Sequence, residues 1–395
     1  MPTGLYYKRG TKNMKNTLDA DDYIRAAKRL EKSAGWKYQT QRFLLNRLSE
    51  IARLKEEGKR GEYEPQNGSE FIINDGGHRR LVKSLCPRDA VFQHALADEI
   101  LTPGLTKYLI YDNGAGLKGK GISFTRRRLE EHLRWHYRRY GTEGYILVID
   151  FRKYFDNIRH DIAMEEIFRR IPDAKTIKAV EKIFNMYKVD VSFSKDPDII
   201  NKVYNSLEYQ DIPDNLKTGK RYMRKSLGIG SPISQITGLL LPTAIDNYVK
   251  TVKQVHCYNV YMDDRIIIHP DKQFLKELLE NIGVIAQELG IHINRKKTQI
   301  IKLSHGFTWL KTRYIITDSG KIIKKIPHDI VTAQRRKMKK MARMVVDGEI
   351  PLEYFENQYK SWAGGKKLYN AHRTMMNMES LYRRLLEWIA QKKKE

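Results

Sequence analysis

Two adjacent acidic residues, Asp263 and Asp264, stand between two short apolar segments of the sequence. Val260 before them and residues 266–268 after them have the β-branched composition of strands, so the acids are expected at the turn of a hairpin. Neighbouring carboxylates repel each other and raise each other's pKa, which favours a divalent cation bound beside them. An ordinary polar turn is the alternative, because Asp is common in turns.

A third acid, Asp150, directly follows the uninterrupted apolar segment 145–149, which predicts a buried strand. If this strand and the hairpin are neighbours in one antiparallel sheet, the three carboxylates of Asp150, Asp263 and Asp264 converge. Three such groups could hold two Mg²⁺ ions about 3.5–4 Å apart. Phosphoryl transfer uses this arrangement, because it depends on positioning and charge neutralisation more than on covalent work by side chains.

The composition points to a polyanionic partner, since 73 Lys and Arg against 47 Asp and Glu give a formal charge of +26. A membrane surface is the competing partner. However, no apolar run approaches the ~20 residues of a spanning helix and no signal peptide opens the chain, so no membrane association is expected. Cys86 and Cys257 are too few for a disulfide framework or a zinc site, and we expect a reducing, cytoplasmic location.

One basic segment has the composition of a nucleic-acid contact. Residues 118–140 carry eight Lys and Arg against two Glu, interleaved with aromatic residues from Phe124 to Tyr140. This mixture suits phosphate contacts and base stacking, although a solvated helix face is the alternative. The glycine-rich segment 113–121 before it could cradle a phosphate, but Gly121 follows Lys120 where a P-loop requires Ser or Thr.

The elements that must position these residues are indicated by periodicity and by turn residues. Hairpins are predicted at 71–82, with its turn at 75–77, and at 307–316. Pro242 should kink the helix predicted at 233–254. Helices are predicted over 21–59, 87–101, much of 163–222, 233–254, 271–289 and most of the chain from residue 327.

Two of these segments resemble motifs of reverse transcriptases. The Tyr-Met-Asp-Asp tetrapeptide at 261–264 is similar to their motif C, and residues 150–155 are similar to motif A, an Asp with an aromatic residue five positions later. The resemblance implies that Asp150, Asp263 and Asp264 bind the metal ions, with the backbone carbonyl of Phe151 near them. It implies that Phe155 is a bulky gate at the sugar 2′ position, which favours dNTPs over rNTPs. Core packing is the alternative role for Phe155. Tyr261 and Met262 would lie beside the substrate.

Further segments resemble the remaining motifs in the family's order. Residues 228–235 are similar to motif B, which implies contacts of Gly230 and Gln235 with template and nucleotide. Residues 290–297 are similar to motif D, whose lysine protonates the departing pyrophosphate. Lys297 is our candidate for that role, with Lys296 as the alternative. Residues 307–310 resemble the primer grip of motif E, although Lys311 follows where the motif commonly has Gly. The 77–82 hairpin resembles the fingers, with Arg80 as a ligand of the triphosphate.

The resemblance implies an α+β, right-hand polymerase with fingers, a palm carrying a small antiparallel sheet, and a helical thumb. We expect the N-terminal extension and fingers at 1–143, the palm at 144–326 with a fingers-like helical insertion at 163–222, and the basic thumb at 327–395. The implied activity is RNA-directed DNA polymerisation, in which dNTPs extend a DNA or RNA primer on a template RNA. The implied cofactors are two Mg²⁺ ions, with Mn²⁺ as an alternative.

The form of motif B at 229–235, Ile-Gly-x-x-x-Ser-Gln, resembles reverse transcriptases of the diversity-generating retroelements of bacteria and phages. That subgroup implies error-prone copying of a template-repeat RNA, a structured non-coding RNA and a basic accessory protein. A bacterial or phage-defence reverse transcriptase making untemplated or protein-primed DNA is one alternative. A non-catalytic RNA-binding protein on a polymerase fold is another. An RNA-dependent RNA polymerase is a third, against which Phe155 argues.

Overall fold

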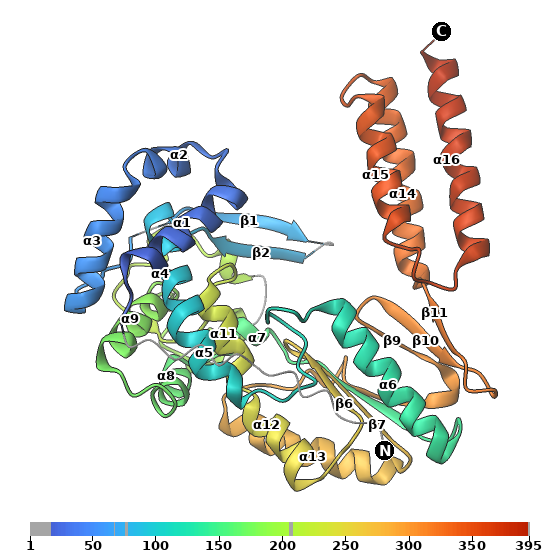
Figure 1. Ribbon diagram of the computed structural model, residues 1–395, viewed down its shortest axis with the longest axis horizontal. Helices are drawn as coiled ribbons and strands as arrows, with labels where there is room; N and C mark the ends of the chain where they lie inside the picture. The colour runs from blue at the N-terminus through green and yellow to red at the C-terminus, as the bar shows by residue number, and fades with distance from the viewer. Residues whose placement is uncertain (1–16, 67, 76–77, 205–207, 394–395) are drawn as a thin grey trace.

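A four-stranded antiparallel sheet carries the segments with the acidic residues (Figure 1). The computed structural model describes residues 17–66, 68–75, 78–204 and 208–393. In spatial order the strands are β6 (Tyr258–Tyr261), β7 (Asp264–His269), β3 (Tyr145–Ile149) and β8 (Gln299–Lys302). The register pairs Ile149 with Arg265. The prediction that the apolar strand and the acidic hairpin are antiparallel neighbours is therefore confirmed.

Helices cover both faces of this sheet. On one face Ile146, Ile266 and Ile268 pack with Leu129 and Leu133 of α6 (Ile122–Tyr140). On the other face Leu147, Ile149 and Ile267 belong to the core formed with α11, α12 and α13. These helices are α11 (Pro232–Leu240), α12 (Thr243–Asn247) and α13 (Lys272–Glu288). Burial on both faces explains why the strand sequences are continuously apolar instead of alternating, and each fully buried Ile or Leu stabilises the fold by about 1.5–3 kcal/mol.

The N-terminal part is helical apart from one hairpin. The predicted helix over 21–59 is three helices, because Gly35 and Asn46 interrupt it: α1 (Ala20–Ala34), α2 (Tyr38–Leu45) and α3 (Arg47–Arg60). The predicted hairpin is β1 (Glu70–Asp75) with β2 (His78–Lys83), and its turn residues 76–77 lie outside the described residues. The predicted helix over 87–101 is α4 (Pro87–Leu96) and a π-helical turn (Ala97–Leu101), followed by α5 (Thr102–Leu105).

The segment after motif A is mainly helical, as predicted. Its helices are α7 (Tyr154–Asn157), α8 (His160–Phe168), α9 (Ala174–Asn185) and α10 (Pro197–Tyr204). Sequence periodicity missed the short pair β4 (Val189–Asp190) and β5 (Tyr222–Met223), because two-residue strands show no detectable alternation. The predicted interruption at Pro242 is confirmed: α11 ends at Leu240, Pro242 precedes α12, and a π-helical turn (Tyr248–Val252) follows.

The C-terminal helices form a bundle with its own apolar core, set beside the small sheet that precedes it (Figure 1). That sheet contains β9 (Phe307–Trp309), β10 (Thr312–Ile316) and β11 (Ile322–Lys325), so the predicted second hairpin is confirmed. The bundle contains α14 (His328–Val346), α15 (Leu352–Gly364) and α16 (His372–Lys392). Among the helices of the described ranges, none is both long enough and apolar enough to cross a membrane.

Candidate active site

Asp150 stands at the end of β3 and is fixed by the loop between α13 and β8. Asn294 Nδ2 donates a hydrogen bond to Asp150 Oδ2 at 2.9 Å, and the Asn294 amide donates to the Asp150 carbonyl at 2.8 Å. The Asp150 amide donates to Thr298 Oγ1 at 3.3 Å. Lys297 Nζ lies 3.7 Å from Asp150 Oδ1. The segment that resembles motif D therefore lies close to Asp150, because three residues of this loop contact that acid.

Asp263 and Asp264 lie at a tight turn between β6 and β7. Tyr261 pairs with Asp264, so Met262 and Asp263 are the two central residues of the turn. Met262 has a φ of 58°, the left-handed conformation that two-residue hairpin turns require and that costs a residue with a Cβ roughly 1–2 kcal/mol. Because Ile149 faces Arg265, the next pair of residues along the two strands is Asp150 and Asp264.

The acidic groups influence one another electrostatically. Burial raises the pKa of Asp264 to about 6, and the negative charges of Asp263 and Asp150 add to this effect. Burial is also the main cause that raises the pKa of Asp263, with a contribution from Asp150. Arg265 and Lys297 act in the opposite direction on both carboxyls, but they do not cancel the shifts. The site thus has an excess of negative charge, which a bound cation would offset.

The residues suit a divalent cation in donor type and in charge, since carboxylate oxygens are the ligands that hard cations prefer. In the part of the chain that the structure describes, however, no three Asp, Glu, His or Cys side chains are close enough to form a ready metal cluster. The pairing of β3 with β7 brings Asp150 and the acidic hairpin to the same end of the sheet. Their side chains would still have to turn toward one another to coordinate an ion.

Phe155 in α7 is held from behind by α11. A Cβ added to Gly238 would lie 2.9 Å from Cε1 of the Phe155 ring, so the ring rests directly on the helix backbone. Tyr154 packs edge-on against Phe155 at 5.4 Å and donates from Oη to the Gly238 carbonyl at 2.6 Å. The half-buried Phe155 ring is therefore clamped, and it cannot retreat toward α11.

The other predicted nucleotide contacts belong to several different elements. Gly230 precedes α11 with a φ of 105° and open space where a Cβ would stand, while Gln235 is exposed on α11. Phe151 is buried. Tyr261 and Met262 are half-buried in the acidic hairpin. Arg80 belongs to β2, but its side chain lies outside the described residues. Lys296 is exposed.

The turn between β9 and β10 forms although Lys311 stands where motif E commonly has Gly. Leu310 and Lys311 have φ values of 45° and 57°, so both adopt the left-handed conformation that glycine favours. The hairpin nevertheless closes, with Thr312 paired to Trp309. Arg126 of α6 donates to the Leu310 carbonyl at 2.9 Å, which ties this turn to α6.

Part of the interpretation of the basic segment 118–140 is wrong. Phe124 and His136 are buried in the core side of α6, so they are not available for stacking on bases. Four arginines of α6 are exposed, and Arg139 covers the Trp135 ring at 3.9 Å. The solvated face is therefore basic, but its aromatic residues are mostly structural.

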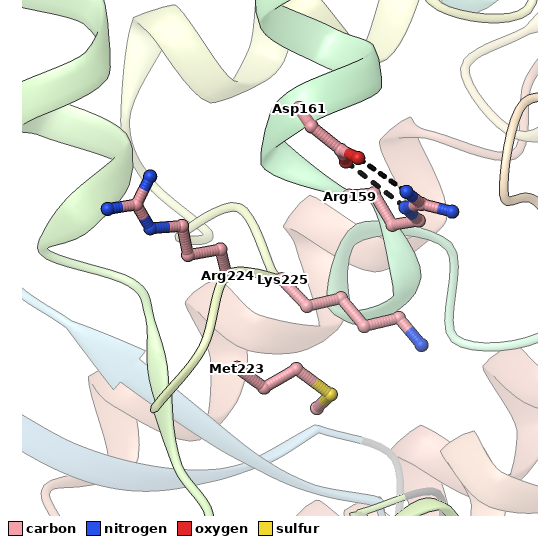
Figure 2. A pocket seen from close by; sticks show the side chains of 5 residues that line it. All are labelled: Arg159, Asp161, Met223, Arg224 and Lys225. Atoms are coloured by element: carbon pink, nitrogen blue, oxygen red, sulfur yellow. Dashed lines mark hydrogen bonds and ion pairs between the residues drawn. The ribbon is translucent and has the colours of Figure 1, made fainter. Parts of the chain in front are cut away.

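A separate hollow of about 420 Å³ contains none of the predicted site residues (Figure 2). It is lined by Arg159, Asp161, Met223, Arg224 and Lys225. Asp161 pairs with Arg159, whereas Arg224 points away from them in the close-up. Burial lowers the pKa of Lys225. The side chains that line this hollow are mainly basic, and Arg159 lies beside Gly290 of the segment that resembles motif D.

Two contributions to the site could not be selected from sequence alone. Asn294 and Thr298 hold Asp150, although nothing in their residue types distinguishes them from ordinary polar loop residues. Arg265 is 1% exposed, and it is among the largest fully buried side chains. A charged residue inside an otherwise apolar strand was the available signal for it.

A small antiparallel sheet with an acidic hairpin beside the end of a buried strand, together with an N-terminal helical part and a C-terminal helical bundle, is the architecture of a right-hand polymerase. Residues 118–314 match the family model described as reverse transcriptase (RNA-dependent DNA polymerase). These residues therefore match a reverse transcriptase domain, a family of RNA-directed DNA polymerases, which are nucleotidyltransferases. No curated protein matches the sequence.

Solved structures similar to this chain include telomerases of two yeasts. Telomerase from Candida albicans, in complex with a TWJ fragment of telomeric RNA, is 13% identical with a TM-score of 0.47, over 87% of this chain and 57% of that one. Apo telomerase from Candida tropicalis truncated from its C-terminal domain is 14% identical with a TM-score of 0.43, over 66% and 55%. Apo telomerase from the same yeast is 15% identical with a TM-score of 0.43, over 66% and 49%. The chain spans about half the length of these proteins.

Proposed function

We propose that this protein is an RNA-directed DNA polymerase that extends a DNA or RNA primer with dNTPs on a template RNA. The observation that carries the proposal is the pairing of β3 with β7, which sets Asp150 beside Asp264 within the reverse transcriptase domain. Asp150, Asp263 and Asp264 would hold divalent ions, for which we propose Mg²⁺, with Mn²⁺ as an alternative. Such ions, when bound, supply activation of the attacking oxygen and charge stabilisation of the leaving group.

The chain's own residues would position the substrates. Asn294 keeps the Asp150 carboxylate oriented, because it binds Oδ2 and leaves Oδ1 toward Lys297. We assign proton donation to the departing pyrophosphate to Lys297, whose ammonium lies 3.7 Å from Asp150. Phe155 would exclude a ribonucleotide, since its ring is clamped against α11 and a 2′-hydroxyl would contact it. The open space at Gly230 would let the backbone approach the nucleotide.

Two exposed surfaces suit the binding of RNA. The first is formed by the four exposed arginines of α6, namely Arg127, Arg134, Arg138 and Arg139. The second surrounds α2, where Trp36 and Tyr38 are 78% and 75% exposed and Lys37 stacks over Trp36 at 5.5 Å. Exposed aromatic rings with adjacent cations can stack on bases and contact phosphates. We propose fingers at 1–143, palm at 144–326 and thumb at 327–395 around this RNA.

We further propose the retroelement subgroup, on the form of motif B at 229–235. The template would then be a template-repeat RNA copied with errors at adenines, with a structured non-coding RNA and a basic accessory protein as partners. This proposal is finer than the polymerase activity and can fail independently of it.

The experiment that tests both levels uses the purified protein with the RNA that co-purifies with it. Each dNTP and rNTP is supplied with Mg²⁺, and the products are sequenced. We expect a DNA copy from dNTPs that Asp263→Asn abolishes and Asp214→Asn retains, because the Asp214 side chain is fully exposed far along the chain from the hairpin. Errors concentrated at template adenines would support the subgroup. An untemplated or homopolymeric product would favour a defence enzyme, and RNA binding without synthesis would refute the polymerase.

A further inference from the structure

The buried Arg265 connects two parts of the candidate active site. It follows Asp264 in β7 and is 1% exposed. Met262 and Asp263 are the two central residues of the acidic turn. Arg265 Nη1 donates to the Asp263 carbonyl at 3.1 Å and to the Met262 carbonyl at 3.4 Å. Its guanidinium also lies 4.7 Å from the centre of the Phe151 ring, directly after Asp150. One side chain thus contacts both segments that carry the acids.

A second layer of buried polar groups holds Arg265. Asp246 of α12 is 1% exposed, and its Oδ1 lies 3.4 Å from Arg265 Nε. Tyr258 in β6 is completely buried and donates from Oη to the same Asp246 oxygen at 2.6 Å. The side chain of Arg265 is therefore anchored between α12 and β6.

The geometry argues against a role for this pair in stability alone. Arg265 Nε has no hydrogen-bond partner among the described residues, and the same is true of Asp246 Oδ2. A buried ion pair with such incomplete hydrogen bonding gives little stability, and apolar residues of similar size often do as well or better. The next three residues of the strand, Ile266 to Ile268, are apolar, so an apolar residue would suit the strand at position 265 as well. The guanidinium does make hydrogen bonds to the turn carbonyls, whereas its Nε makes none to Asp246.

Resting on the proposed polymerase function, we propose that Arg265 is a positioning residue that holds the Met262–Asp263 turn so that Asp263 and Asp264 can accept divalent cations. The turn needs such support, since Met262 has a φ of 58° and two like-charged side chains are adjacent in the sequence. Arg265 opposes both effects by binding the turn carbonyls and by placing a positive charge under the hairpin. Asp246 and Tyr258 act through Arg265 by fixing its orientation.

The test compares Mn²⁺ binding, measured by electron paramagnetic resonance on the full chain without nucleotide, with steady-state incorporation of dNTPs. The main variant is Arg265→Met combined with Asp246→Asn, which removes both buried charges and leaves an oxygen for Tyr258. Arg265→Lys is the second variant, because an ammonium keeps the charge but cannot contact the turn and Asp246 as a fork. Arg88→Met is the matched control. Its side chain is 13% exposed and paired with the buried Asp89 in the N-terminal helices.

We expect the double variant to keep a cooperative thermal transition, to bind Mn²⁺ about 10–100-fold more weakly and to lose kcat by a similar factor, with KM for dNTP little changed. Arg265→Lys should be intermediate, and Arg88→Met should bind Mn²⁺ as the unchanged protein does. Wild-type Mn²⁺ affinity in both Arg265 variants would overturn the inference, and so would an unchanged protein that binds no Mn²⁺. If Mn²⁺ binding depends on Arg265 but no DNA is made, the positioning role stands and the proposed function fails.

Discussion

Replacement of Phe155 by valine tests whether this ring selects the sugar of the nucleotide. The Gly238 backbone lies behind the ring, with Cε1 only 2.9 Å from where a Cβ would stand, so an incoming 2′-hydroxyl cannot push the ring aside. Steric rejection by an apolar pocket is worth about 1–3 kcal/mol, or roughly 10–200-fold. Valine leaves this space open. We therefore expect the preference for dNTP over rNTP, expressed as a ratio of kcat/KM values, to fall about 10–100-fold.

The assay is single-nucleotide addition to a primer with matched dNTP and rNTP pairs. The smaller side chain should also lower stability by about 1–2 kcal/mol, because the ring is only half-buried. Tyr154→Phe is the matched control, since it removes the 2.6 Å hydrogen bond to Gly238 and leaves the gate in place. That control should lose about 0.5–1.5 kcal/mol of stability without a change in sugar preference. An unchanged ratio in Phe155→Val would show that the ring is only core packing.

Three further outcomes follow from the site and its charge. Because the pKa of Asp264 is raised to about 6 by burial, its ionised form destabilises the metal-free fold above that pH and not below its unfolded value near 4. Asp264→Asn should therefore raise the free energy of unfolding at pH 7.5 by on the order of 1–3 kcal/mol, with the gain vanishing near pH 4; coincident urea curves at pH 7.5 would contradict this. Lys297→Ala should lower kcat about 10²–10⁴-fold with little loss of stability, whereas Lys296→Ala should not; equal effects would reject Lys297 as the proton donor. RNA affinity should fall about 10³–10⁵-fold between 50 and 200 mM salt in filter binding if six to ten phosphates are contacted, and a flat dependence would count against a phosphate-bound RNA.

The palm strands could be predicted because their sequences are apolar on both faces. Residues 145–149 and 266–268 have no alternation to misread, and the acids stand directly at their ends. The pairing of Ile149 with Arg265 could only be assumed, since residues more than a hundred positions apart carry no local signal of their register. That the two strands are antiparallel neighbours was a condition of the metal-site hypothesis, and the structure meets it.

Long-range partners explain what the sequence did not reveal. Arg265 would ordinarily be expected on a solvated face, and its burial depends on Asp246 and Tyr258, which become its neighbours only in the folded chain. Asn294 is selected over the other polar residues of its loop only by its contact with Asp150. The role of Arg80 stays a prediction, because its side chain lies outside the described residues.

The five residues from Tyr261 to Arg265 concentrate features that oppose folding. Met262 has an unfavourable backbone conformation, the pKa values of Asp263 and Asp264 are raised, and Arg265 is a buried charge with an imperfect partner. The apolar cores on both sides of the sheet offset these costs. Strain that persists in one short segment is a reason to look for function there. If the strain in this segment exists because the segment binds metal ions, Asp264→Asn should make the metal-free protein both more stable and inactive. If the hairpin had only a structural role, Asp264→Asn would not raise stability while abolishing activity.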